Sequence, residues 1–242
     1  MNRTAERSMS TALSSLLLLG AFAGLVVAAN AQSPEMQQRI AEIKAASAKN
    51  KQALMSYSWN EQDTISIKGD VKKVQHYQVR LGPDGKPQKT SLDPPTEAAP
   101  PSGGRMKQRI VAKKTDEFKE YGGDMKALAQ QYAPPDPALI QQAAAQGNIA
   151  LSPVAGSPSQ VQLVIKNYLK PGDSMTLVFD KEQKSIVRVQ IASYMDDPKD
   201  AMNLTVQYSK LPDGTNHIDS MVIDGVEKQL KVAVQNSNYA HV

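Results

Sequence analysis

The chain has 242 residues, with 28 lysines and arginines, 24 aspartates and glutamates, and no cysteine. Without cysteine it cannot form disulfides, a cysteine-ligated zinc site or a thiol nucleophile. The small basic excess, with charges of both signs interleaved along the chain, predicts a solvated surface and no nucleic-acid partner.

The N-terminal segment has the layout of a secretory signal peptide. Arg3 and Arg7 precede an apolar run from Leu13 to Ala29, and a small-x-small cleavage site ends at Ala31, before Gln32. The alternative is a retained membrane anchor, but the run falls short of the roughly 20 apolar residues that a span needs. We expect a signal peptide over residues 1–31, a periplasmic or secreted protein, one α+β domain over residues 32–242, and no transmembrane span after cleavage.

The first half of the expected domain combines a helix, a hairpin and a loop. Ser33-Pro34-Glu35 predicts a helix start, and a ragged apolar stripe extends this helix to Met55. From Tyr57 to Leu81 apolar residues alternate, and Lys68-Gly69-Asp70 divides them into a hairpin, to which a third short strand is a candidate extension. Residues 93–104 contain four prolines and two glycines, which predicts an exposed Pro-rich loop.

The second half combines two helices with a long run of strands. Residues 105–132 carry apolar side chains at spacings of three and four, which predicts a helix with a candidate kink or break at Gly122-Gly123. Pro137 starts a shorter helix through Ala145. Alternating strands then follow, including two near 216–223 and 227–235 around an Asp224-Gly225 hairpin turn. The predicted fold class is α+β, a curved antiparallel β-meander with helices packed on its apolar face.

The titratable residues do not form a known catalytic or metal-binding motif. His217 and Asp219 share a strand face at a spacing compatible with a proton relay or one edge of a metal site, but an exposed polar strand face is the favoured interpretation. Asp196, Asp197 and Asp200 offer oxygen ligands for calcium but lack the glycine and closing glutamate of an EF-hand loop. We therefore expect no metal, no cofactor and no enzymatic activity. The remaining enzymatic alternative is a hydrolase, which requires two carboxylates converging in a cleft.

Methionine is frequent in the predicted meander, at Met175, Met195, Met202 and Met221. Its flexible side chain fills irregular space and lines adaptable apolar surfaces. One interpretation is a core short of aromatic residues, and the other is an apolar hollow for an acyl chain or a hydrophobic peptide. In the second interpretation the ligand-binding wall consists of alternating apolar residues of the meander: Leu177, Phe179, Val189, Ile191, Leu204, Val206, Leu230 and Val232.

Some segments resemble known exported proteins. Pro171-Gly172-Asp173 with Leu177-Val178-Phe179-Asp180, Leu211-Pro212-Asp213-Gly214-Thr215 and the end Asn236-Ser237-Asn238-Tyr239 are similar to uncharacterised exported bacterial proteins. The element order over most of residues 35–236 resembles the periplasmic lipoprotein-carrier superfamily of LolA-like carriers and RseB-like sensors. That resemblance implies a half-barrel sheet over a helical lid, with an acyl-binding cavity between them. The chain departs from it in having fewer strands before the helical insertion and in its Pro-rich loop.

Two functions remain open on this basis. The leading hypothesis is an exported binding or carrier module for a hydrophobic ligand, such as a lipid or an acyl chain. The alternative is a structural or adaptor protein of the cell envelope, whose partner protein would bind a sheet edge or the loop at 93–104. A cavity of ~300–1,000 Å³ favours the first hypothesis, and a filled core favours the second.

Overall fold

The computed structural model describes residues 48–94, 105–133 and 135–242. These residues form ten strands, the helices α3 and α4, and a helical stretch at 48–54. The elements in chain order are β1 (Tyr57–Ile67), β2 (Asp70–Leu81), β3 (Pro87–Ser91), α3 (Arg105–Gln130), α4 (Pro137–Ala145), β4 (Ile149–Val154), β5 (Ser157–Lys166), β6 (Ser174–Asp180), β7 (Ser185–Tyr194), β8 (Ala201–Lys210), β9 (Asn216–Gly225) and β10 (Leu230–His241).

All ten strands belong to one antiparallel sheet, in the order β3-β2-β1-β10-β9-β8-β7-β6-β5-β4. The chain builds one edge with β1, β2 and β3, and leaves the sheet for α3 and α4. It returns at the opposite edge with β4 and meanders back until β10 pairs with β1. The N-terminal hairpin and the C-terminal strand are therefore neighbours in the centre of the sheet.

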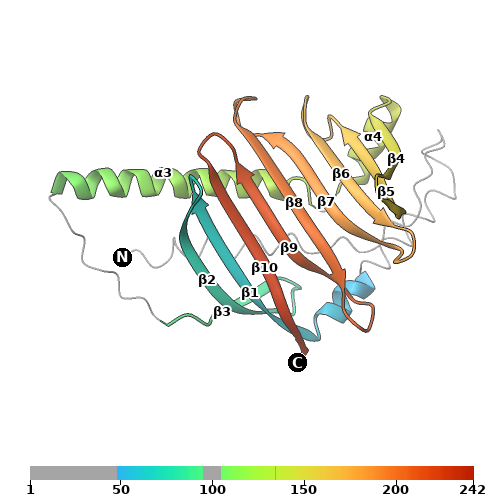
Figure 1. Cartoon of the computed structure of the whole chain (residues 1–242), viewed down its shortest axis with the longest axis horizontal. Helices are drawn as coiled ribbons and strands as arrows, with labels where there is room; N and C mark the ends of the chain where they lie inside the picture. The colour runs from blue at the N-terminus through green and yellow to red at the C-terminus, as the bar shows by residue number, and fades with distance from the viewer. Residues whose placement is uncertain (1–47, 95–104, 134) are drawn as a thin grey trace.

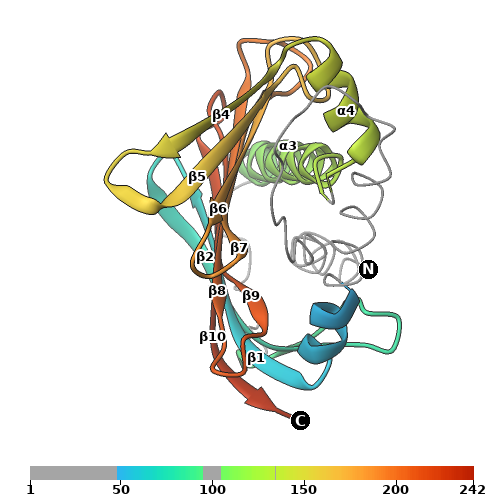
Figure 2. The ribbon, with the colours of Figure 1, turned by 90° about the vertical axis from the view of Figure 1, so that its right-hand side faces the viewer.

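The sheet is open and curved, and the helices lie on its concave side. Figure 2 shows the sheet edge-on, with α3, α4 and the helical stretch at 48–54 on the same side. The expected α+β class and the curved antiparallel sheet with helices on one face are confirmed. Most of the helix expected over residues 33–55, and residues 95–104 of the Pro-rich loop, lie outside the described residues.

The apolar face of the sheet consists of cross-strand rows. Strand alternation places every second side chain on the concave face, and the antiparallel register aligns these side chains between neighbouring strands. One row runs from β5 to β1 through Ile165, Met175, Ile191, Leu204, Ile223, Val232 and Ile65. The adjacent row runs through Leu163, Leu177, Val189, Val206, Met221 and Val234, and ends at Asp63 on β1.

Helix α3 covers these rows with an apolar stripe. Tyr121, Met125, Leu128 and Tyr132, at the spacing of a helix face, are buried in the same core as the sheet rows. The helix runs without a break through Gly122-Gly123, so the expected break there is absent. Among the described residues, no helix combines the length and the apolar content that a membrane crossing requires.

The expected hairpin turn at Asp224-Gly225 is wrong. Both residues belong to β9, where Gly225 pairs with Leu230 of β10 and with Met202 of β8. The turn lies at residues 226–229. Gly225 has a steric role, because a Cβ atom built there would lie 2.5 Å from the Tyr121 ring and 2.7 Å from the Met125 sulfur. The glycine lets α3 approach the strand.

The expected exposed strand face at His217 is also wrong. A register shift between Gln207 and Tyr208 interrupts the β8–β9 pairing, and Asn216, His217 and Ile218 are all buried. The His217 ring lies 4.2 Å from the Tyr239 ring, and burial lowers the pKa of His217. Strand alternation fails at this position because the bulge changes which side chains point inward.

Replacing Gly225 by alanine is expected to lower the free energy of unfolding by about 1–3 kcal/mol, the usual cost of overpacking a core. Tyr121 cannot move aside freely, because its hydroxyl donates a 2.5 Å hydrogen bond to buried Asp200. The matched control is Gly123→Ala in α3, where the new methyl group meets no atom within 4 Å. We expect this control to gain about 0.5–1 kcal/mol from helix propensity. Urea unfolding measures the free energy of unfolding of both variants. Equal values for the two would contradict the steric role of Gly225.

Candidate functional site

A hollow of about 520 Å³ lies between α3 and the adjoining strands β1, β2, β9 and β10. Its volume is within the range of small-molecule sites, ~300–1,000 Å³. Most of its surface is apolar, contributed by Ile65, Ile67, Val111, Phe118, Met125, Ile223, Leu230 and Val232. The hollow therefore offers an apolar chamber at one end of the core.

The hollow forms where the apolar rows of the sheet reach their end. One row ends at Ile65 of β1, whose neighbour on β2 is Lys73, so the sheet offers α3 no further apolar side chain there. On the helix side, Gly122 lines the hollow without a side chain, and Phe118 is only partly buried. The facing surfaces consequently do not fill the space between them.

Lysines line this apolar chamber on its β2 and α3 sides. Lys72 and Lys73 on β2, and Lys114, Lys119 and Lys126 on α3, line the hollow, together with the carboxylate of Asp63. Lys72 lies 2.9 Å from Asp70, and Lys119 lies 3.7 Å from Asp116. Among the described residues, no carboxylate lies within ion-pair distance of Lys73 or Lys114. The site therefore combines an apolar interior with positive charge from two facing elements.

A buried ionic cluster adjoins the hollow on the concave face of the sheet. Glu61 and Asp63 point inward from β1, and the Lys89 ammonium of β3 binds Glu61 and lies 3.3 Å from Asp63. All three side chains are buried. This cluster separates the main core from a smaller one around Trp59 and Val79. It is thus a polar boundary between two apolar regions on one sheet face.

Burial dominates the titration of Glu61. Removal from water is the largest cause that raises the pKa of Glu61, and the charge of Asp63 adds to it, while Lys89 lowers it; the net pKa is about 7. Two carboxylates therefore converge here, as the hydrolase alternative requires. Only Asp63 lines the hollow, and the Lys89 ammonium bridges the pair. This arrangement favours a structural ion cluster over an acid–base pair facing a substrate.

Two tyrosine–aspartate hydrogen bonds fix α3 and the segment after it above the sheet. Tyr121 donates to Asp200 over 2.5 Å, and Tyr132 donates to Asp173 over 2.6 Å and to Ser193 over 2.7 Å. Burial raises the pKa of both tyrosines, so both stay protonated donors. Asp200 is therefore a buried acceptor for the helix. Among the described residues, no group of three or more metal-ligating side chains is arranged to hold an ion.

The sequence-predicted wall residues share one apolar core, and two of them line the hollow. Leu230 and Val232 of β10 do so. The other six pack against the core without lining it: Leu177, Phe179, Val189, Ile191, Leu204 and Val206. Their contact with a ligand stays a prediction. Sequence reasoning missed the lysines, because β2 and α3 are distant in the chain and only the fold brings them to one opening.

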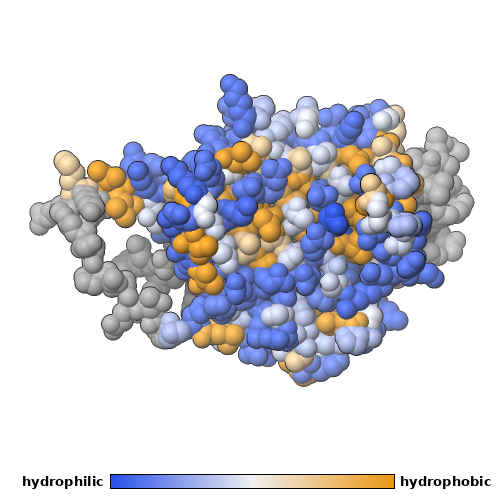
Figure 3. Space-filling model, viewed as in Figure 1, coloured by the Kyte–Doolittle hydropathy of each residue, from blue (hydrophilic) through white to orange (hydrophobic). Residues whose placement is uncertain are grey.

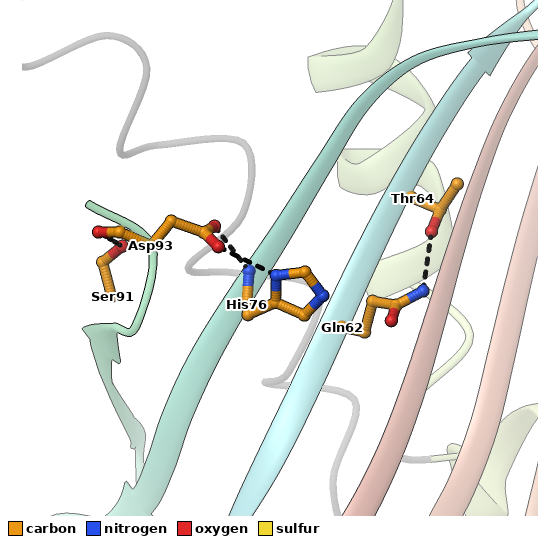
Figure 4. Close-up of polar contacts among 5 residues, drawn as sticks. All are labelled: Gln62, Thr64, His76, Ser91 and Asp93. Carbon is orange, nitrogen blue, oxygen red and sulfur yellow. Dashed lines mark hydrogen bonds and ion pairs between the residues drawn. The ribbon is translucent and has the colours of Figure 1, made fainter. Parts of the chain in front are cut away.

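His76 and Asp93 form a polar pair on the outer side of the sheet edge (Figure 4). Asp93 accepts from the backbone amide of His76, and its other oxygen lies 2.8 Å from the His76 ring. These bonds lower the pKa of Asp93. The Ser91 hydroxyl donates to the Asp93 backbone carbonyl. The pair holds the segment after β3 against β2.

Comparison with known proteins gives neither a matching family model nor a matching curated sequence. Three solved structures match with low scores. A DUF1329 family protein from Desulfovibrio piger has a TM-score of 0.38 and 10% identity, over 80% of this chain and 89% of its own. A LolA superfamily protein from Nitrosomonas europaea has a TM-score of 0.33 and 9% identity, over 78% and 87%. A Vibrio parahaemolyticus domain described as an outer membrane lipoprotein-sorting protein has a TM-score of 0.34 and 8% identity, over 80% and 90%.

These matches include a protein of the LolA superfamily, the group that the element order of this chain resembles, and the likeness is weak. At TM-scores of 0.33 to 0.38 it does not indicate what this chain binds. The functional inference depends on the hollow, its apolar lining and its lysines.

Replacing Glu61 by glutamine is expected to flatten the pH dependence of stability between pH 5 and 8. The folded protein keeps the Glu61 proton up to about pH 7, whereas an unfolded glutamate loses it near its ordinary value of 4.5. The folded state then binds more protons in this range, so the free energy of unfolding falls as pH rises, by up to about 3 kcal/mol. Urea unfolding at several pH values measures the slope.

The control for this experiment is Asp180→Asn, whose carboxylate has no histidine partner among the described residues. Hydrogen bonds, first that from the Gln183 backbone amide, lower the pKa of Asp180 in the fold, so this carboxylate stabilises the protein above its ordinary value of 3.8 and that contribution is lost in more acidic solution. Its removal should change the slope only on the acid side. An unchanged slope between pH 5 and 8 in Glu61→Gln would contradict the raised pKa of Glu61.

Proposed function

We propose that this chain is an exported binding or carrier protein for an amphiphile with an apolar chain and an anionic head group, held in the hollow beneath α3. The observation that carries the proposal is the 520 Å³ hollow with an apolar interior and lysines on its β2 and α3 sides. The N-terminal layout of a signal peptide supports a periplasmic or secreted location.

The apolar lining supplies the main driving force for such a ligand. Each methylene group moved from water into an apolar site contributes about 0.8 kcal/mol, so a chain of about eight methylenes gains roughly 6 kcal/mol before the costs of binding. Ile65, Leu230 and Val232 present branched side chains from adjacent strands, and Met125 faces them from α3. Methionine and branched residues suit a flexible chain better than a rigid, polar ligand.

The lysines determine the orientation of the ligand. Lys73 and Lys114 lie on different elements, both exposed to solvent, and neither is neutralised by a described carboxylate. An anionic head group between them gains two charge-assisted contacts at the water-exposed boundary, while its chain stays in the apolar interior. A cationic head group would meet repulsion at the same place.

The envelope adaptor remains the alternative function, and the burial of most predicted wall residues in the core is the observation that favours it. Six of the eight predicted wall residues are packed without lining any part of the hollow. An adaptor needs no cavity, however, and the hollow has the size of a ligand site. The binding proposal accounts for both the space and its lysines.

A long-chain fatty acid is expected to bind more tightly than the fatty alcohol of the same length. The double variant Lys73→Gln, Lys114→Gln should weaken fatty-acid binding about five- to tenfold and leave the alcohol unchanged, because exposed charge contacts contribute up to ~1 kcal/mol each. The matched control is Lys166→Gln with Lys181→Gln, two exposed lysines remote from the hollow. Isothermal titration calorimetry measures the binding of both ligands to the wild type and to the two double variants. Equal binding of acid and alcohol to the wild type would contradict the anionic head group.

Filling the hollow is expected to abolish the binding of any chain-like ligand. Thr115 lines the hollow from the exposed surface of α3, so Thr115→Trp occupies the space without disturbing the buried core. Ala112→Trp is the control, on an exposed position of the same helix that does not line the hollow. Native mass spectra of the exported protein, before and after solvent extraction, should show a bound lipid-sized species in the wild type and in the control only. A bare wild-type mass that fatty acid does not shift would favour the adaptor.

A further inference from the structure

The apolar stripe of α3 is longer than the sheet that it covers. Tyr121 and Met125 are 6% and 1% exposed over the sheet, whereas Ile110 and Met106, on the same stripe toward the N-terminus, are 54% and 79% exposed. Figure 1 shows the first half of α3 projecting past the β2 edge, and Figure 3 shows hydrophobic surface at this projecting end. We refer to residues 105–114 as the α3 overhang.

The overhang is also strongly basic. Its sequence, RMKQRIVAKK, contains five lysines and arginines and no acidic residue, in a chain whose total excess is only +4. Arg109 and Lys113 are exposed beside Met106 and Ile110. A helix with exposed apolar side chains and a basic polar surface is typical of segments that lie in the interface of an anionic membrane.

From these observations we infer that the α3 overhang docks on an anionic lipid bilayer surface. Met106, Ile110 and Val111 insert into the boundary between head groups and acyl chains, and Arg109 and Lys113 contact the anionic head groups. A second copy of the chain is a poorer partner for the same patch, because a two-fold contact would bring the exposed basic residues Arg109, Lys113 and Lys114 of both copies together.

Docking in this way would place the opening of the hollow at the membrane. Val111 and Lys114, at the end of the overhang, also line the hollow. An amphiphile could therefore pass between the bilayer and the hollow with little exposure of its chain to water. This role goes beyond the proposed ligand binding and is tested separately, because vesicle binding requires no ligand in the hollow.

The test is co-sedimentation of the exported protein with vesicles of phosphatidylcholine alone or mixed with phosphatidylglycerol, at low and at physiological salt. Arg109→Gln with Lys113→Gln removes charge but keeps the apolar residues, and should weaken binding to the anionic vesicles about twentyfold, since each basic residue near such a surface contributes about fivefold. Met106→Gln with Ile110→Gln keeps the charge and should weaken binding at least tenfold. None of these four residues lines the hollow.

The control is Leu151→Gln, which removes a large residue that is 55% exposed on the opposite edge strand β4 and should bind like the wild type. Because all variants share one N-terminus, residual signal peptide cannot explain a difference between them. Equal binding to both vesicle types, or no loss in either double variant, overturns the inference. A wild-type dimer that Met106→Gln with Ile110→Gln dissociates, without vesicle binding, would overturn it in favour of a second copy.

Discussion

Helix α3 packs its apolar stripe onto the concave face of the ten-stranded sheet, and the main features of the molecule depend on where that contact begins and ends. Over the central strands the contact is dense, with Tyr121, Met125, Leu128 and Tyr132 buried against the cross-strand rows. Gly225 permits the close approach, since a side chain there would collide with Tyr121. Hydrogen bonds to buried aspartates then set the position of the helix along the sheet.

The concave face of the sheet changes from apolar to charged toward its β3 edge. From β5 to β10 it presents rows of apolar side chains, whereas β1 and β3 add the buried cluster of Glu61, Asp63 and Lys89. Burying a charge is costly unless it is paired. The contacts of Lys89 with Glu61 and Asp63 supply that pairing. Because the sheet presents charged side chains toward this edge, α3 has no further apolar surface to pack against, and the hollow opens there.

The hollow and the α3 overhang lie at the same end of the helix, and both follow from one mismatch in length. The apolar stripe of α3 extends beyond the apolar rows of the sheet, so it first faces an incompletely filled space and then solvent. An unfilled apolar space and an exposed apolar stripe both lower stability, whereas a ligand and a membrane would offset these costs. The basic residues at both places would favour partners of negative charge.

Local patterns in the sequence were sufficient to predict most of the strands, the two helices and the apolar face of the meander. Strand β4 was not predicted, and β3 was only a candidate extension of the first hairpin. A period of two, or of three and four, is determined by the backbone geometry of a few neighbouring residues, as for the strand around Leu204 and for the helix over residues 105–132. The shared core location of the eight wall candidates followed from the same alternation. Local reasoning failed at Asp224-Gly225, where the close approach of α3 requires the glycine within the strand. It also failed at His217, where a bulge changes which side chains point inward.

The tertiary structure alone decided the position of the candidate site. Pairing of β10 with β1 brings Val232 beside Ile65 across more than half of the chain, and α3 brings Lys114 to the same hollow that Lys73 of β2 lines. Neither proximity has a local signature, because contacts between distant segments depend on which surfaces pack in the complete fold. The sequence by itself thus determined the elements and their apolar faces. The tertiary structure decided how far the apolar stripe of α3 packs against the apolar rows of the sheet, and the hollow lies where that packing ends.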